Sequence, residues 1–276
     1  MMKTKTNNKV DIYRRLLKYP PFSVSRRAGA MTIKHTLKEG EITATCIEYV
    51  TSEDAEKLYA LCYVAEKNKT YKIIKTEKFD AIAELTTNIW EIRKLTNCND
   101  DMYIYKALDK ITGIKISYNF EKKKSSTHII HAVKFNQATG EINVLMPLQM
   151  FKNFQIKSLS IDIEKYSKLT ATAKNLYGYL ATNSGEIFTE NLLIERTTIQ
   201  AKRKDNAQKL LKTALNELKA EHIIKDFKIT KKDGERQIIV DKFNAKTNIH
   251  NGRKNLSITV GKTETKNPAN TSGSKD

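Results

Sequence analysis

The chain has 276 residues and a formal net charge of +18, and this length can hold one large domain or two ordinary ones. A hydrophobic content of 39% is enough for packed cores, while 10 Gly and 4 Pro exclude a loop-built or fibrous protein. No apolar run approaches a membrane span, and no apolar segment follows the basic N-terminus as in a secretory signal. Three cysteines without metal-ligand spacing (Cys46, Cys62 and Cys98) indicate buried thiols in a reducing compartment, so we expect a cytoplasmic protein.

The positive charge is unevenly distributed. Residues 1–38 carry ten Lys or Arg against one Asp, whereas residues 39–168 carry nineteen against eighteen acidic residues. Residues 169–243 carry fourteen against ten, and residues 244–276 carry six against two. A lysine-rich composition alone does not explain this segregation. A basic surface binds polyanions by releasing their counterions, so we expect nucleic acid as the partner and no membrane association.

Both ends of the chain are predicted to lie outside the folded core. Pro20-Pro21 breaks any short helix before it, and the arginines around it show no apolar periodicity. Residues 1–37 are therefore expected to form a basic N-terminal arm, irregular over its first 30 residues. Residues 244–276 are polar and are expected to form a disordered basic tail.

Between the two ends lies a weak internal repeat. The stretch 58–65 resembles residues 176–181, and residues 107–111 resemble residues 214–218. Residues 107–111 and residues 214–218 are each followed by a β-like stretch, at residues 114–120 and 223–229 respectively. The same order of elements in duplicate predicts two copies of one supersecondary unit, a first unit at residues 38–155 and a second unit at residues 156–243.

The second unit has the clearer pattern. Apolar residues from Leu169 to Leu180 follow helical spacing, a short strand covers residues 186–188, and Thr189 can cap a second helix. A third helix has its apolar face at Ala207, Leu211, Ala214, Leu215 and Leu218. Asp233-Gly234 then joins two alternating strands, which is a strong hairpin signal. Helix, strand, helix, helix and hairpin is the order of a winged helix-turn-helix, which would make the fold α+β with two tandem winged-helix domains.

In a helix-turn-helix, the N-terminal part of the third helix enters the major groove of DNA. Lysine and arginine there can bind phosphates or guanine edges, and asparagine and glutamine can pair with adenine. Asp205 is expected to cap the helix, and the hairpin tip to grip the neighbouring backbone. The predicted DNA-binding residues are Lys202, Arg203, Lys204, Asn206, Gln208, Lys209, Lys231, Lys232 and Arg236. The alternative is a solvated basic face on a structural helix.

The first unit matches the same pattern more loosely. Ser52 is expected to cap its first helix, and Asn99 to cap its third. The start of that third helix contains Asp100 and Asp101, which would repel phosphate. We therefore expect this unit to serve dimerisation, regulation or weak backbone contact. Its remaining elements are an insertion at 68–85, a second helix at 89–96, a third at 100–112, strands at 114–120, 127–135 and 141–145, and a connector at 155–168.

No pattern in the sequence indicates an enzyme. His128 and His131 are spaced i, i+3, which would place their rings on opposite faces of a strand, unlike the paired histidines of metal-dependent nicking enzymes. The sequence contains no G-x-x-x-x-G-K-[ST] loop, zinc pattern or G-x-S-x-G motif. We expect no catalytic residues, no metal and no cofactor.

Residues 169–180, 206–218 and 223–227 resemble the plasmid replication initiators that bind iterons through tandem winged helices. Residues 52–64 and 103–120 fit the first winged helix of that family, and the likeness extends over roughly residues 40–243. The resemblance implies binding to direct repeats in double-stranded DNA at an origin, opening of the adjacent duplex, and recruitment of a host initiator and replicative helicase. It also implies a homodimer that exchanges with monomers.

Two other functions are also consistent with a basic surface. A winged-helix transcriptional repressor would bind a palindromic operator as a dimer. A structural or host-interaction protein would bind polyanions without sequence preference.

Overall fold

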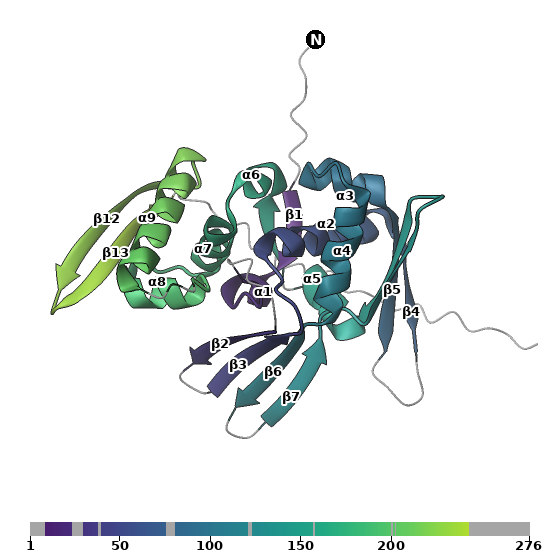
Figure 1. Cartoon of the computed structure of the whole chain (residues 1–276), viewed down its shortest axis with the longest axis horizontal. Coiled ribbons are helices and arrows are strands. Elements are labelled where there is room, and N and C mark those ends of the chain that lie inside the picture. Colours follow the sequence, from purple (N-terminus) through teal and green to yellow (C-terminus); the bar gives the residue numbers. More distant parts are fainter. Residues whose placement is uncertain are drawn as a thin grey trace, which may run out of the picture.

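The computed structural model describes residues 9–23, 30–37, 40–75, 81–120, 123–156, 158–199, 201 and 203–242. The second unit lies at one end of the long axis, and the first unit fills the other end (Figure 1). The predicted tail at 244–276 and Lys202 lie outside the described residues.

The first unit is built around a long helix, α2, most of whose residues are buried. Two shorter helices and an antiparallel sheet of order β4-β5-β9-β8 pack around it. Its elements are α2 (Ser52–Asn68), β4 (Tyr71–Ile74), β5 (Ile82–Asn88), α3 (Ile89–Thr96), α4 (Asp101–Thr112), β8 (Ala132–Asn136) and β9 (Glu141–Pro147).

The second unit has the predicted order of elements. Its helices pack on one another through α7 and α9, and its sheet has the order β11-β13-β12. Its elements are α7 (Ala171–Thr182), β11 (Ile187–Thr189), α8 (Glu190–Arg196), α9 (Lys204–Ala220), β12 (Ile224–Lys232) and β13 (Glu235–Lys242).

The two units share a helix, a strand, two helices and two strands in the same order, as the repeat in the sequence led us to expect, and the first unit has further strands between them. In each, a strand precedes the second helix and pairs with the last strand of the unit, as β5 pairs with β9 and β11 with β13. The residue ending that first strand caps the next helix in both units. Asn88 accepts from the backbone of Trp90, and Thr189 accepts from the backbone of Leu192.

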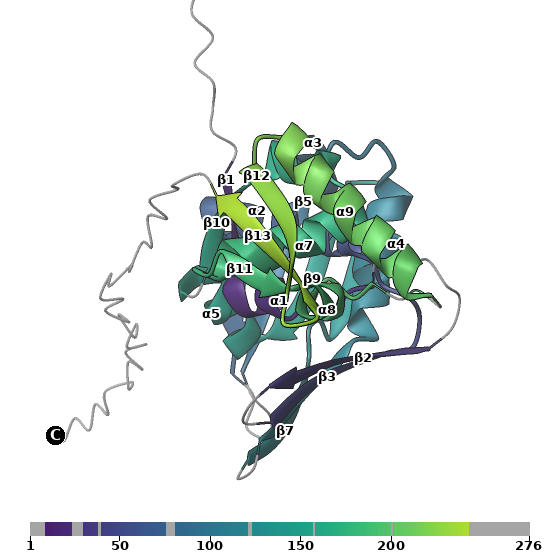
Figure 2. The same ribbon diagram turned by 90° about the vertical axis from the view of Figure 1, so that its left-hand side faces the viewer.

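The counterpart of the hairpin strand β12 differs from the prediction. Residues 114–120 do follow α4, but they join a separate sheet, and the strand that corresponds to β12 is β8. The predicted strand 127–135 is two strands in different sheets, separated by the buried Ile129 and Ile130. The separate sheet has the order β2 (Met31–Leu37), β3 (Gly40–Cys46), β6 (Lys115–Phe120) and β7 (Lys123–His128). It projects away from the helices, as Figure 2 shows.

The prediction of an irregular N-terminal arm is wrong for residues 9–23, and residues 31–37, which were assigned to the same arm, form strand β2 of the folded protein. Strand β1 pairs with β10 of the connector, and Leu16, Leu17 and Phe22 are buried in the core. These elements are too short to show periodicity, and strand pairing across about 150 residues leaves no local signal. The elements involved are β1 (Lys9–Tyr13), α1 (Arg14–Lys18), α5 (Leu148–Ile156), β10 (Ser158–Asp162) and α6 (Ile163–Lys168).

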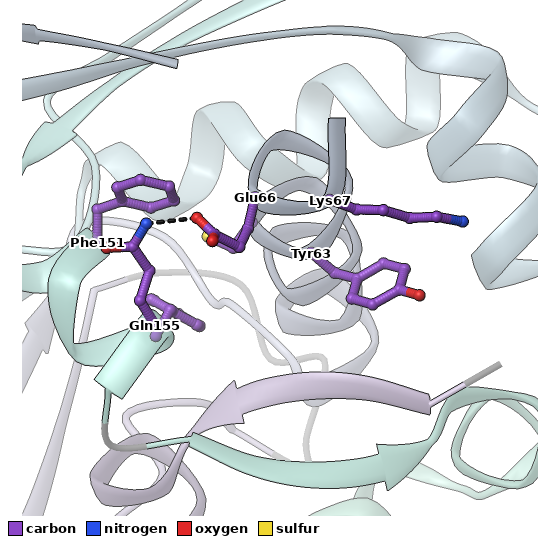
Figure 3. Close-up of a pocket in the computed structure, with 7 residues that line it drawn as sticks. Tyr63, Glu66, Lys67, Phe151 and Gln155 are labelled. Atoms are coloured by element: carbon purple, nitrogen blue, oxygen red, sulfur yellow. Dashed lines mark hydrogen bonds between the residues drawn. The ribbon is translucent and has the colours of Figure 1, made fainter. Parts of the chain in front are cut away.

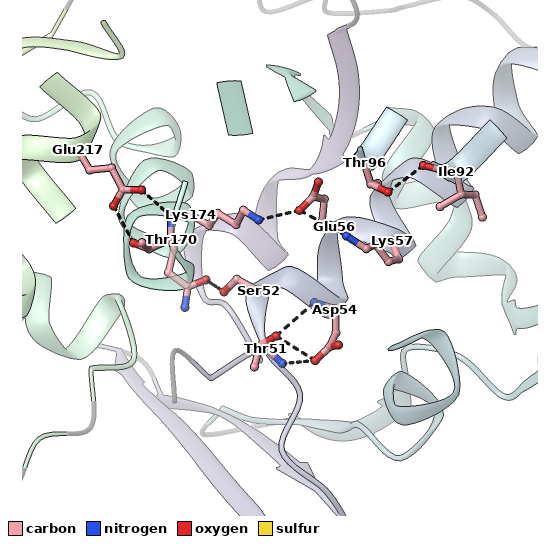
Figure 4. Close-up of polar contacts among 11 residues, drawn as sticks. Thr51, Ser52, Asp54, Glu56, Lys57, Ile92, Thr96, Thr170, Lys174 and Glu217 are labelled. Carbon is pink, nitrogen blue, oxygen red and sulfur yellow. Dashed lines mark hydrogen bonds and ion pairs between the residues drawn. The ribbon is translucent and has the colours of Figure 1, made fainter. Parts of the chain in front are cut away.

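Buried polar contacts join the two units (Figure 4). Lys174 of α7 donates to the carboxylate of Glu56 on α2 at 2.7 Å, and both side chains are at most 3% exposed. Asn175 contacts Ser52 and donates to the carbonyl of Phe22 at 3.3 Å. The start of α2, the N-terminal segment and α7 therefore meet in one fully buried cluster.

Two predicted helix caps are displaced by one residue. Thr51, not Ser52, caps α2, and Asp54 completes a capping box with it. Asp100, not Asn99, caps α4 by accepting from the backbone of Tyr103 at 3.0 Å.

Candidate nucleic-acid interface

Helix α9 is fixed by its apolar face. All five residues predicted for that face are buried. Near the C-terminal end of α9, Glu217 accepts from the backbone N–H and the hydroxyl of Thr170 at 2.6 and 2.7 Å. Thr170 is the N-cap residue of α7, so this contact holds α9 against the start of α7. The apolar packing and this bidentate contact both involve α7, so the face of α9 directed away from α7 is left towards solvent.

Four of the predicted DNA-binding residues lie exposed at the start of α9. They are Arg203, Lys204, Asn206 and Lys209. Arg203 occupies the N-cap position and makes no side-chain cap, so the expectation that Asp205 caps this helix is wrong. Asp205 instead lies within the first turn, where a carboxylate offsets the unpaired backbone N–H groups.

Gln208 and Arg236 have an internal partner. Gln208 donates to the carboxylate of Glu190 at 2.6 Å, and the Nε of Arg236 lies 3.0 Å from its other oxygen. The Glu190 side chain is 4% exposed, whereas that of Arg236 is 43% exposed. One buried carboxylate at the start of α8 therefore links α9 to the hairpin.

The hairpin of β12 and β13 ends in a tight turn. Asp233 and Gly234 have φ angles of 51° and 81°, as the two central residues of a type I′ turn require. Lys231 and Lys232 directly precede this turn and are exposed, with Arg236 and Glu235 as their cross-strand partners. The Asp-Gly signal thus places two lysines at the hairpin tip as predicted.

A lysine anchors the other end of the hairpin. Nζ of Lys242 donates to the carbonyls of Leu180, Asn183 and Gly185 at 3.0, 2.6 and 2.7 Å. Its partial burial lowers the pKa of this ammonium group. Carbonyls in the last turn of α7 and just after it are thereby satisfied by a side chain 57 or more residues away.

Sequence reasoning missed part of the exposed face of α9. Lys212, Thr213 and Asn216 are exposed on the turns after Lys209. Their helical spacing between the buried Leu211, Ala214, Leu215 and Leu218 was the signal that could have found them. The role of Glu190 had no such signal, because a carboxylate in a first helical turn is ordinary.

The start of the corresponding helix of the first unit is partly covered. Tyr105 of α4 stacks on Phe135 of β8, with ring centroids 5.9 Å apart, and Gln137 contacts Met102. Asp101 lies 3.4 Å from the guanidinium of Arg93. The start of α4 therefore presents acidic and covered side chains where α9 presents exposed basic and amide groups.

The two histidines predicted to lie on opposite faces are close together. His128 ends β7 and His131 precedes β8, so they are not on one strand, and their ring centroids are 6.3 Å apart. Burial and the neighbouring His128 lower the pKa of His131. Within the described ranges, no group of three or more His, Cys, Asp or Glu residues could hold a metal ion.

A separate hollow of about 190 Å³ lies between α2 and α5 (Figure 3). Phe151 and Phe154 line it, and Gln155 donates to Glu66 at its edge. None of its lining residues belongs to α9 or to the hairpin.

No helix in the described part of the chain is long and apolar enough to cross a membrane. No protein-family model and no curated protein matches the sequence. Among solved structures, a crystal structure of the RctB domains 2-3 (RctB-155-483) is similar, with 10% sequence identity and a TM-score of 0.48 over 80% of this chain and 94% of that chain.

Proposed function

We propose that this protein binds double-stranded DNA in a sequence-specific manner through the second unit, acting as a winged helix. Helix α9 is assigned to the major groove, and the β12–β13 hairpin to the adjacent backbone or minor groove. Arg203, Lys204, Asn206 and Lys209 are the proposed contacts from the helix. No catalytic step and no cofactor is part of the proposal.

The observation that carries the proposal is the difference between α9 and α4. The two helices occupy the same place in the repeated topology, yet only α9 combines an exposed basic start with a neighbouring pair of hairpin-tip lysines. A merely solvated charged helix would not require this combination. The exposed amide side chain of Asn206, at the start of the same helix, supplies a group that can discriminate bases.

The biological role that fits best is initiation of plasmid DNA replication, and its support is the sequence resemblance of residues 40–243 to iteron-binding initiators. In this role the protein binds direct repeats at an origin, helps to open the adjacent duplex, and recruits a host initiator and replicative helicase in the cytoplasm. Its dimers would exchange with the monomers that load on single repeats.

The test is selection of duplexes from a random-sequence library by the full chain, followed by footprinting on DNA of the replicon that encodes it. About 150 mM salt screens weak backbone contacts. Several protected direct repeats beside an AT-rich segment are the expected result. A single protected palindrome would assign the protein as a repressor, and the absence of any preferred duplex would reduce it to a non-specific polyanion binder.

A further inference from the structure

Glu190 is almost completely buried, yet each of its carboxylate oxygens has a different partner. Oε2 accepts from Nε2 of Gln208 on α9 at 2.6 Å, and Oε1 lies 3.0 Å from Nε of Arg236 on β13. Residue Glu190 is 3% exposed. A carboxylate in such a place is costly unless it is paired and hydrogen-bonded, and here one oxygen accepts a hydrogen bond from Gln208 while the other is in ion-pair contact with Arg236.

The arrangement is asymmetric in exposure. Arg236 gives its Nε edge to the buried carboxylate, while 43% of its side chain remains exposed. A guanidinium is planar and carries its donors in a fixed fork, so holding one edge also fixes the direction of the other. Lys231, at the hairpin tip, is the cross-strand partner of Arg236.

We propose that Glu190 is a positioning residue that orients Arg236 for contact with DNA and sets the spacing between α9 and the hairpin through Gln208. This inference rests on the proposed function of the second unit. It reassigns Gln208 from a DNA-contacting residue to an internal brace. Arg236 remains a contact, with its geometry fixed before DNA arrives, which lowers the entropy lost on binding.

The sign of one substitution separates this role from simple electrostatics. Glu190→Gln removes a negative charge next to a polyanion-binding surface, so a charge effect alone would strengthen DNA binding. Loss of the orienting ion pair predicts the opposite, a weakening of about five- to tenfold. Glu190→Gln is close to isosteric, and the amide oxygen of the new side chain can still accept from one donor.

The experiment measures affinity of the full chain for the duplex selected as described above, for the wild type, Glu190→Gln, Arg236→Lys and the double variant. Arg236→Lys keeps the charge but lacks the second edge of the fork, so the slope of affinity against salt should not change. Once Arg236 is replaced by lysine, no guanidinium fork remains for Glu190 to orient. Adding Glu190→Gln should then have no further effect, so the double variant should bind no more weakly than Arg236→Lys alone. Thermal unfolding of each variant is recorded in parallel.

Tighter binding by Glu190→Gln, or losses that multiply in the double variant, would overturn the inference while leaving the proposed function intact. A wild-type chain that selects no preferred duplex would overturn the proposed function itself. If Glu190→Gln does not fold, Arg203→Lys serves as the comparison, because the described residues supply no carboxylate partner to Arg203. Arg236→Lys should then lose at least threefold more affinity than Arg203→Lys, and equal losses would contradict the role of Glu190.

Discussion

Single side chains on α9 divide into those that face solvent and those held by the protein. Asn206 is exposed, whereas Gln208, two residues later, donates to the buried Glu190. The residue type alone, Asn or Gln, does not distinguish a side chain available for contact with a base from one that is held by another part of the protein. The hydrogen-bond partner makes the distinction, and for Gln208 that partner is Glu190 on α8.

Asn206→Ala should relax specificity at one base pair by about 1–3 kcal/mol, because it removes an amide that can pair with adenine. Affinities for a set of single-base variants of the selected duplex would measure this. The variant for comparison combines Lys231→Gln and Lys232→Gln. It should weaken binding to all duplexes and reduce the slope of log affinity against log salt concentration by about 1.8. Identical behaviour of the two variants would refute the division into base-reading and backbone-binding residues.

His35 should make the free energy of unfolding depend on pH. The ring is 1% exposed and lies 3.0 Å from the carbonyl of Pro20, and burial lowers its pKa below 6.5. The unfolded chain therefore binds the proton more readily, so stability is retained above pH 6.5 and lost as the pH falls below it. Urea unfolding between pH 7.5 and pH 5 should show this loss.

His35→Gln should flatten that pH dependence. His131 also has a lowered pKa, so His131→Gln is the matched control and should remove a smaller part, since this ring is less buried. An unchanged pH dependence in His35→Gln would rule out His35 as its source.

At the level of elements, α1 and α7 approach closely at a glycine. A Cβ added to Gly178 would lie 3.0 Å from a side-chain carbon of Leu17 and 3.1 Å from its carbonyl oxygen. Alanine normally stabilises a helix interior relative to glycine. Here the backbone of α1 blocks the added methyl group.

Gly178→Ala should therefore lower the free energy of unfolding by about 1–3 kcal/mol, as overpacking does. Denaturant unfolding would measure the change. Gly113→Ala is the control, because its nearest neighbouring atom is 3.4 Å away and its φ is −74°, so a change within about 0.5 kcal/mol is expected there. Equal effects at both positions would contradict the close approach of α1 and α7.

The acidic start of α4 gives a second prediction at the level of elements. Asp100→Asn combined with Asp101→Asn should leave specific DNA binding intact or improve it, because asparagine can still cap the helix and two phosphate-repelling charges are lost. Affinity for the selected duplex is the measurement. A large loss would mean that the first unit makes essential DNA contacts through these carboxylates.

At the scale of the whole molecule, one buried ion pair joins the two units. Among the described residues, Lys174→Met would leave the buried carboxylate of Glu56 with Lys57, at 3.8 Å, as its remaining ion-pair partner. Removing one partner of such a pair costs about 3–5 kcal/mol of unfolding free energy. Adding Glu56→Gln should restore part of this stability, since the uncompensated charge is gone.

The exposed pair of Lys219 and Asp226 is the control for that prediction. Its N···O distance is 2.8 Å, but its side chains are 49% and 54% exposed. Lys219→Met should therefore change stability by at most about 1 kcal/mol. A loss from Lys174→Met no greater than from Lys219→Met would show that the contact between the units contributes little.

The sequence by itself determined most of the second unit, because its signals are local. The apolar spacing of α9, the cap at Thr189 and the turn at Asp233-Gly234 each act within a few residues, and each lies where it was predicted. The exposed positions of the proposed contact residues Asn206 and Lys231 followed from the same patterns. The repeated order of helices and strands was also readable, although β8 rather than β6 turned out to match β12.

Tertiary structure alone decided the fold of the N-terminal segment, the junction between the units and the partners of Glu190. Strand β1 pairs with β10, Asn175 reaches Phe22, and Glu190 binds Gln208 and Arg236. These contacts join residues between 18 and 153 positions apart, and their members are ordinary polar or short apolar residues. Periodicity and capping act within a few residues, so no pattern in the chain could specify which distant partner each one meets.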